Sequence, residues 1–136
     1  MAISIEKEFK IIIATEKIIY RNNLASALRM QNFTVEFCEG GFHLLNLLEQ
    51  SDNNISLVIV HENMQDMPAQ EIISLTRTHK NKNELPIIFI SQKNQTEEIS
   101  DIISSGANEY IVQGSNLQSI LEKTKKYYKI FSNFIS

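Results

Sequence analysis

The chain has 136 residues, of which 43% are hydrophobic and 21% charged, and this is enough apolar material for the core of one domain. A formal net charge of −3 does not favour nucleic acid or a membrane surface as a partner. The single cysteine, Cys38, excludes an intramolecular disulfide, and we expect it to be buried. No apolar run approaches the roughly 18 residues of a membrane span and no signal peptide is evident, so we expect a cytoplasmic location.

Short apolar runs rich in β-branched residues predict strands, and they alternate with stretches in which apolar residues recur at helical spacing. In chain order the predicted strands are KIIIA (10–14), TVEFC (34–38), LVIV (57–60), PIIFI (86–90) and EYIV (109–112). The predicted helices cover 17–31, 42–50, 69–79, 96–105 and a last segment that begins after Ser115, a residue type that caps helices.

Strands that are apolar throughout, joined by helices, predict an α/β fold in which helices cover both faces of a parallel sheet. Right-handed crossovers leave few topologies for five strands, and the flavodoxin-like order 2-1-3-4-5 is the leading one. Its binding crevice lies at the carboxyl ends of strands 1 and 3, where the strand order reverses. The pattern therefore nominates the polar residues that follow the strands, which are Thr15, Glu16, His61, Ser91 and Gln113.

Several segments, in the expected order and spacing, resemble the receiver domain of bacterial response regulators. LVIVHENMQDM is similar to the family's third strand and its loop D-x-N-M-P-x-M, with Asn63, Met64 and Met67 in register. PIIFIS is similar to P-I-I-x-L-T/S, and GANEYIVQG is similar to G-A-D-D-Y-L-x-K-P. Gly41 matches the glycine that opens the family's second helix.

The resemblance spans roughly residues 10–128 and predicts one domain over 1–136, with 129–136 as an extension of the last helix. It implies that an aspartate accepts a phosphoryl group from a histidine kinase. Mg²⁺ is then held by an acidic pair after strand 1, by the acceptor, and by a backbone carbonyl two residues further on. A lysine after strand 5 and a hydroxyl after strand 4 contact the phosphoryl group, and an aromatic residue on strand 5 switches the output face.

This chain departs from that pattern at three chemical positions. His61 replaces the acceptor aspartate, Thr15 replaces the first acid of the pair, and Gln113 replaces the lysine. The positions that keep their residue type or role are Glu16, Asn63, Ser91 and Tyr110. Mg²⁺ requires oxygen ligands, imidazole suits other metals, and glutamine brings no charge to a transferred phosphoryl group. We therefore expect no enzymatic activity, no cofactor, and Mg²⁺ binding that is weak or lost.

The first hypothesis is a pseudo-receiver that acts through protein–protein contacts without phosphorylation. In it, His61 is a polar plug bonded to Glu16, Ser91 or a backbone carbonyl, and a carboxylate partner would keep the ring protonated. Three alternatives remain. His61 could itself accept a phosphoryl group. It could bind a transition metal with Glu16 and Glu62. The pocket of Glu16, His61 and Ser91 could hold a switching ligand in the regulatory domain of a larger two-component protein.

The C-terminal stretch carries apolar residues at helical spacing over about 19 residues, or roughly 28 Å of helix, which is more than is needed to cover the sheet. We expect some of its aromatic residues to form an interaction surface, namely Tyr127, Tyr128, Phe131 and Phe134. The alternative is that they fold back onto the first helix and the edge of the domain. The resemblance implies that a protein partner or a second copy binds the face of the fourth helix, fifth strand and fifth helix. Tyr110 is there either a switch or a partly buried strand aromatic.

Overall fold

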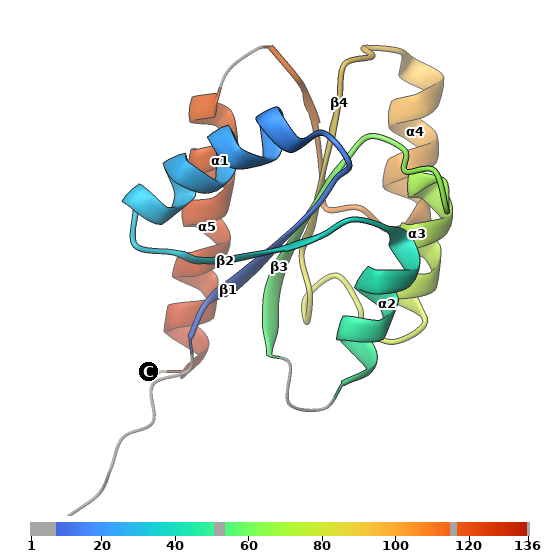
Figure 1. Cartoon of the computed structure of the whole chain (residues 1–136). Helices are drawn as coiled ribbons and strands as arrows, with labels where there is room; N and C mark the ends of the chain where they lie inside the picture. Colours follow the sequence, from blue (N-terminus) through green and yellow to red (C-terminus); the bar gives the residue numbers. More distant parts are fainter. Residues whose placement is uncertain (1–7, 51–53, 115–116, 136) are drawn as a thin grey trace, which may run out of the picture.

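The computed structural model describes residues 8–50, 54–114 and 117–135, and in them five strands alternate with five helices (Figure 1). The strands are β1 (Lys10–Ala14), β2 (Thr34–Cys38), β3 (Ile55–His61), β4 (Ile87–Ser91) and β5 (Glu109–Val112). The helices are α1 (Ile18–Met30), α2 (Gly41–Glu49), α3 (Ala69–Arg77), α4 (Thr96–Ser105) and α5 (Leu117–Ile135). None of these helices is long and apolar enough to cross a membrane.

The strands form one parallel sheet in the order β2-β1-β3-β4-β5, which confirms the predicted flavodoxin-like topology. Two predicted strand ends are wrong in an informative way. The run LVIV was expected to stop before His61, and the run PIIFI before Ser91. Both residues belong to strands, because His61 pairs with Ile90 and Ser91 pairs with Val112 in the ladder. The predicted cap at Ser115 lies outside the described residues.

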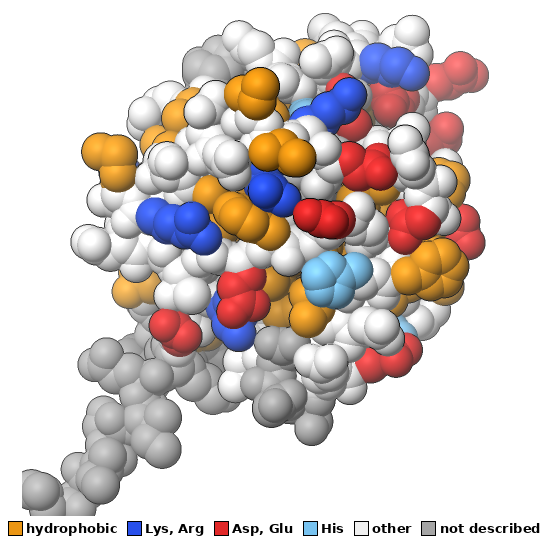
Figure 2. Space-filling model, in the orientation of Figure 1, with side chains coloured by type: hydrophobic (Ala, Val, Ile, Leu, Met, Phe, Trp, Pro, Cys, Tyr) orange, Lys and Arg blue, Asp and Glu red, His pale blue; other side chains and the backbone are white. Residues whose placement is uncertain are grey.

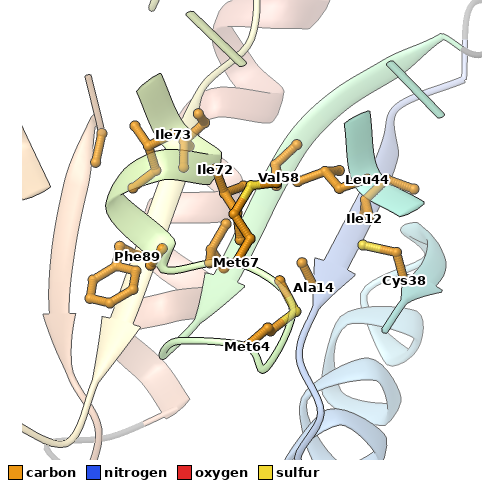
Figure 3. Close-up of a cluster of buried hydrophobic side chains, with 14 of the residues drawn as sticks. Ile12, Ala14, Cys38, Leu44, Val58, Met64, Met67, Ile72, Ile73 and Phe89 are labelled. Atoms are coloured by element: carbon orange, nitrogen blue, oxygen red, sulfur yellow. The ribbon is translucent and has the colours of Figure 1, made fainter. Parts of the chain in front are cut away.

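The sheet has a packed core on each face. Helices α1 and α5 cover one face and α2, α3 and α4 the other (Figure 1). Side chains of β1 alternate between the two cores, since Ile11 and Ile13 belong to the first and Ile12 and Ala14 to the second. Figure 3 shows the second of these cores, where Cys38 lies near Ile12 and Leu44. Cys38 is fully buried, as predicted, and this burial raises the pKa of its thiol to about 12.

The start of α2 depends on a residue from another part of the chain. Asp66, in the loop after β3, accepts hydrogen bonds from the backbone amides of Gly41 (3.0 Å) and Phe42 (3.1 Å). These amides have no partner within the helix, so the carboxylate acts as its N-terminal cap. Only glycine fits at position 41, because a Cβ there would lie 2.8 Å from Cγ1 of Ile72.

The glycine and the asparagine that begin the segment GANEYIVQG, Gly106 and Asn108, have structural roles. Gly106 ends α4 with a φ of +122°, and a Cβ there would lie 2.6 Å from Cγ of Arg77. The Arg77 guanidinium donates to the backbone oxygens of Gly106 and Leu85 (both 2.8 Å) and to Oδ1 of Asn108 (2.9 Å). Arg77 therefore holds the end of α3, the loop before β4 and the start of β5 together.

We expect Asp66→Ala to lower the free energy of unfolding by about 1 kcal/mol, the usual cost of losing a helix cap. The two amide hydrogen bonds, that of Gly41 first, lower the pKa of Asp66 below its ordinary value of 3.8. The stabilisation is therefore complete above that ordinary value and is lost as the pH falls through the lowered pKa. Urea titrations at a series of pH values measure this. The difference between variant and wild type should shrink in acid, and Gln65→Ala, in the same loop, should show neither effect.

Candidate functional site

Three residues at the carboxyl ends of the strands form one hydrogen-bonded chain. His61 ends β3 and is only 2% exposed. Its Nε2 lies 2.6 Å from Oε1 of Gln113, and its Nδ1 lies 3.0 Å from Oγ1 of Thr15. Oγ1 of Thr15 also accepts the backbone N–H of Lys17 at 3.0 Å. Every group is satisfied if Nε2 carries the ring proton and donates it to Gln113, while the Thr15 hydroxyl donates to Nδ1.

Tyr20 of α1 covers the imidazole at the centre of these hydrogen bonds. Its ring stacks on the imidazole of His61, with centroids 4.1 Å apart and planes 18° from parallel. Burial, followed by the negative charge of Glu62, raises the pKa of Tyr20 to about 12. We call Thr15, His61, Gln113 and Tyr20 the histidine brace, because together they join the ends of three strands to α1.

The hydrogen-bond partners expected for His61 are wrong. Glu16 is exposed, and its Oε1 accepts the backbone N–H of Gln65 (2.9 Å), because the longer side chain reaches the loop after β3. Oγ of Ser91 accepts the backbone N–H of Lys93 (3.0 Å). None of the described carboxylates is hydrogen-bonded to the imidazole, so the expected charged partner for a protonated ring is not found.

A surface pocket of about 560 Å³ lies above the brace, and it separates the residues that were expected to act together. Its lining consists of Glu16, Lys17, Glu62, Asn63, Gln65, Ser91, Lys93 and Glu98. His61 is not part of it. In Figure 2 acidic side chains gather at the upper right of the visible face, with basic ones among them. The three residues of the expected pocket are therefore divided. Glu16 and Ser91 line an open polar pocket, whereas the imidazole of His61 is buried and closed off from it.

Asn63 and Tyr110 each have a structural contact. Oδ1 of Asn63 accepts the backbone N–H of Ala69 (2.8 Å) at the start of α3. The Tyr110 ring packs on Phe89, and its hydroxyl lies 2.8 Å from the Lys93 backbone oxygen and 3.1 Å from Oε2 of Glu98. Burial is the main reason that the pKa of Tyr110 is raised. Tyr110 thus ties β5 to α4 and to the loop before it.

The expected aromatic interaction surface on α5 is in part buried. Tyr127 is 9% exposed and its hydroxyl donates to Oε1 of Glu109 (3.0 Å). The ring of Phe131 packs edge-on against Phe9, with centroids 5.2 Å apart, and Tyr128, 44% exposed, also contacts Phe9. Tyr127 and Phe131 thus pack on the domain, as the alternative predicted, while for Tyr128 the interaction surface stays a prediction. The Phe134 side chain lies outside the described part of the structure.

The residues at the strand ends do not fit the Mg²⁺ ion that the resemblance implies. Of the expected three carboxylates only Glu16 remains, and it is bonded to the loop after β3. Both nitrogens of His61 are used within the brace, which also argues against the transition-metal alternative. Within the described residues, no group of three or more His, Cys, Asp and Glu side chains is placed to hold a metal ion.

The strand order and the polar residues at the strand ends define a flavodoxin-like α/β protein with its candidate site at the point where the strand order reverses. The family model for the response regulator receiver domain matches residues 11–125, and the chain belongs to that family. A chemotaxis protein CheY homolog of Campylobacter jejuni is 26% identical over 110 residues, which are 81% of this chain and 82% of that protein.

Solved structures show the same fold. The CheY-like receiver domain protein of Methanospirillum hungatei JF-1 has a TM-score of 0.81 at 18% identity and covers 93% of this chain and 99% of its own. The response regulator TrrA of Thermotoga maritima, solved in complex with Mg²⁺-BeF, has a TM-score of 0.74 at 25% identity. That match covers 88% of this chain and 98% of TrrA.

Burial of His61 predicts its chemical protection. Of the three histidines, His43 and His79 are exposed, so diethyl pyrocarbonate should modify these two in the native protein and spare His61. Tyr20→Ala removes the stacked ring and should make His61 reactive. Ile19→Ala, at an exposed neighbouring position of α1, should not. Peptide mass spectrometry follows each site. Modification of native wild-type His61 at the rate of His43 would show that the brace is open.

Proposed function

We propose that this receiver domain acts by phosphorylation-independent protein–protein interaction and is a binding module rather than an enzyme. The observation that supports this proposal most strongly is the burial and hydrogen bonding of the residue at the family's acceptor position. It holds His61, which is 2% exposed, and both ring nitrogens are bonded to residues at two other substituted positions. A nucleophile must be able to reach its phosphoryl donor, and here His61 does not line the pocket.

The electrostatics of the site support the same proposal. Phosphoryl transfer depends on cations that neutralise charge on the transferred group. In this chain Gln113 stands where the family has a lysine, and its amide oxygen faces the imidazole. Lys17 and Lys93 do line the pocket, but so do Glu16, Glu62 and Glu98, and three carboxylates against two ammonium groups give no net attraction for an anion. These charges favour a site without phosphoryl chemistry.

The interaction surface that we propose is the face formed by α4, β5 and α5. Acidic residues dominate α4, which exposes Glu97 and Asp101, and lysines dominate α5, which exposes Lys125 and Lys129 alongside one acid, Glu122. Between them Glu109 of β5 pairs with Lys126 (3.0 Å) and Lys123 (3.7 Å). Burial would raise the pKa of Glu109, but the hydrogen bonds from Lys126 and Tyr127 and the two lysine charges outweigh it, so the pKa is lowered.

A second copy of the chain would complement this face. Under a two-fold arrangement the acidic residues of α4 in one copy can face the lysines of α5 in the other, and both surfaces are present on the same molecule. Tyr110 lies on β5 at the centre of the face and ties it to α4 through Glu98. The cytoplasmic location, and a role as regulatory domain of a larger protein, remain predictions.

Phosphodonor treatment tests the loss of phosphorylation. We expect that incubation with Mg²⁺ and acetyl phosphate leaves the intact mass unchanged. We also expect that beryllofluoride with Mg²⁺ shifts no amide resonances around His61, because the acceptor is closed and the metal ligands are absent. TrrA of Thermotoga maritima, solved with Mg²⁺-BeF, is the positive control. A stoichiometric phosphoryl adduct on any residue of this chain would contradict the proposal.

Charge reversal tests the interaction face. Lys125→Glu with Lys129→Glu should weaken self-association, measured by light scattering during gel filtration, and added salt should weaken it in the wild type. Reversal of Glu97 and Asp101 to lysine in the same chain should restore association, because the two signs are exchanged. Lys82→Glu, at an exposed position in the loop before β4, is the control. A wild-type chain that remains monomeric at every concentration would exclude the second copy as partner.

A further inference from the structure

We infer that the histidine brace replaces a metal ion as the link between the strand ends, and that it holds the output face in one conformation without Mg²⁺. The inference rests on the proposed function and assigns a mechanical role to the closed site. Four contacts carry it: the two hydrogen bonds of His61, the Lys17 N–H bond to Thr15, and the Tyr20 stack.

The brace connects strands that the sheet itself does not connect. In the order β2-β1-β3-β4-β5, β3 and β5 are separated by β4 and share no ladder. The bond between Nε2 of His61 and Oε1 of Gln113 spans that gap at 2.6 Å. The bond to Thr15 extends the link to the end of β1, and Tyr20 adds α1. Three strand ends and one helix are thus joined through one buried ring.

Burial makes this link costly to break. His61 and Thr15 are 2% and 1% exposed, so a ring nitrogen that lost its partner would remain without water. An unsatisfied buried polar group costs more than a solvent-exposed one, because the desolvation is not compensated. The brace therefore favours the single arrangement in which Thr15 and Gln113 both reach the ring.

Residues adjacent to the brace continue the link to the output face. Gln113 follows β5 directly, and its backbone N–H donates to the oxygen of Ser91 (2.6 Å). Three residues earlier on the same segment, Tyr110 is bound to the loop before α4 and to Glu98. β5 is consequently held from its carboxyl end by His61 and from its middle by α4. A displacement of Tyr110 requires movement of a strand whose end is fixed.

The same contacts exclude Mg²⁺. The ring occupies the position from which an acceptor carboxylate would bind the ion, and the one carboxylate that remains, Glu16, is bonded to Gln65. Removal of His61 alone leaves Thr15 and Gln113, neither of which supplies a carboxylate. Restoration of a metal site therefore requires two new carboxylates, by Thr15→Asp with His61→Asp. Gln113→Lys is added to these because the glutamine would otherwise lose its imidazole partner, and a lysine can donate to the new carboxylate.

The first experiment measures motion with NMR relaxation dispersion on the full chain. In the wild type, we expect no microsecond-to-millisecond exchange at Tyr110 or along α4, with or without millimolar Mg²⁺. Gln113→Leu keeps the size of the side chain but removes the acceptor, and it should introduce exchange at both places. Gln92→Leu, at an exposed position in the loop after β4, should leave the spectrum rigid. Exchange in the wild type, or a rigid Gln113→Leu, would overturn the inference.

The second experiment titrates Mg²⁺ and follows the thermal midpoint and the amide shifts. The wild type and His61→Asp should not respond. The triple variant should bind Mg²⁺ at least roughly tenfold more tightly, the scale on which changes around a metal site act. A folded triple variant without this gain, or a wild type with Mg²⁺-dependent shifts at Glu16, would contradict the inference. Neither result involves a phosphoryl adduct, so failure of the brace is distinguishable from failure of the proposed function.

Discussion

A buried imidazole must find a partner for each of its nitrogens, and this requirement governs the whole edge of the sheet where the strands end. One nitrogen needs an acceptor and the other a donor when the ring is neutral. Thr15 and Gln113 supply these two groups from β1 and β5. Thr15, His61 and Gln113 are thus one hydrogen-bonded unit. A lysine at position 113 could not accept the ring N–H and would force the other tautomer, and an aspartate at position 15 would favour a protonated ring, so either residue would change the neutral pairing.

The two cores provide the rigidity that this unit needs. The central strands are buried on both faces, and the side chains of β1, β3 and β4 fill the space beneath the helices. Interiors packed in this way do not deform continuously. The positions of Thr15, His61 and Gln113 are therefore set by backbone that cannot adjust to them, and the side chains must match the geometry that the sheet imposes.

Sequence reasoning recovered the fold because its signals are local. Central parallel strands are apolar throughout, and KIIIA, TVEFC and EYIV coincide with β1, β2 and β5. It also placed the residues of the candidate site at one edge, since strand order alone determines which ends meet. It did not find the partners of His61. Whether Glu16 turns toward the ring or toward the loop depends on side-chain rotamers that no periodicity encodes. The Tyr20 stack is likewise a tertiary contact, although the position of Tyr20 in the first turn of α1, close to Thr15 in the sequence, could have suggested it.

The error on α5 has a different origin. A comparison of helix length with sheet size takes no account of aromatic residues that lie outside the elements. Phe9 precedes β1 and Phe33 precedes β2, and both rings contact Tyr128. Such contacts between segments far apart in the sequence are invisible to helical spacing. An apolar excess on a terminal helix is informative only after the loops that could cover it have been considered.

The cap of α2 has a consequence for the order in which the chain can fold. The helix has no capping side chain of its own, and its first amides are held by Asp66, 25 residues further along the chain. When α2 has just left the ribosome, this carboxylate and the strand that positions it have not yet emerged. Short helices without caps are marginal in isolation. The β2–α2 unit should therefore remain unformed during synthesis until β3 and its loop have emerged, and native structure at the amino end of the chain must wait for its middle.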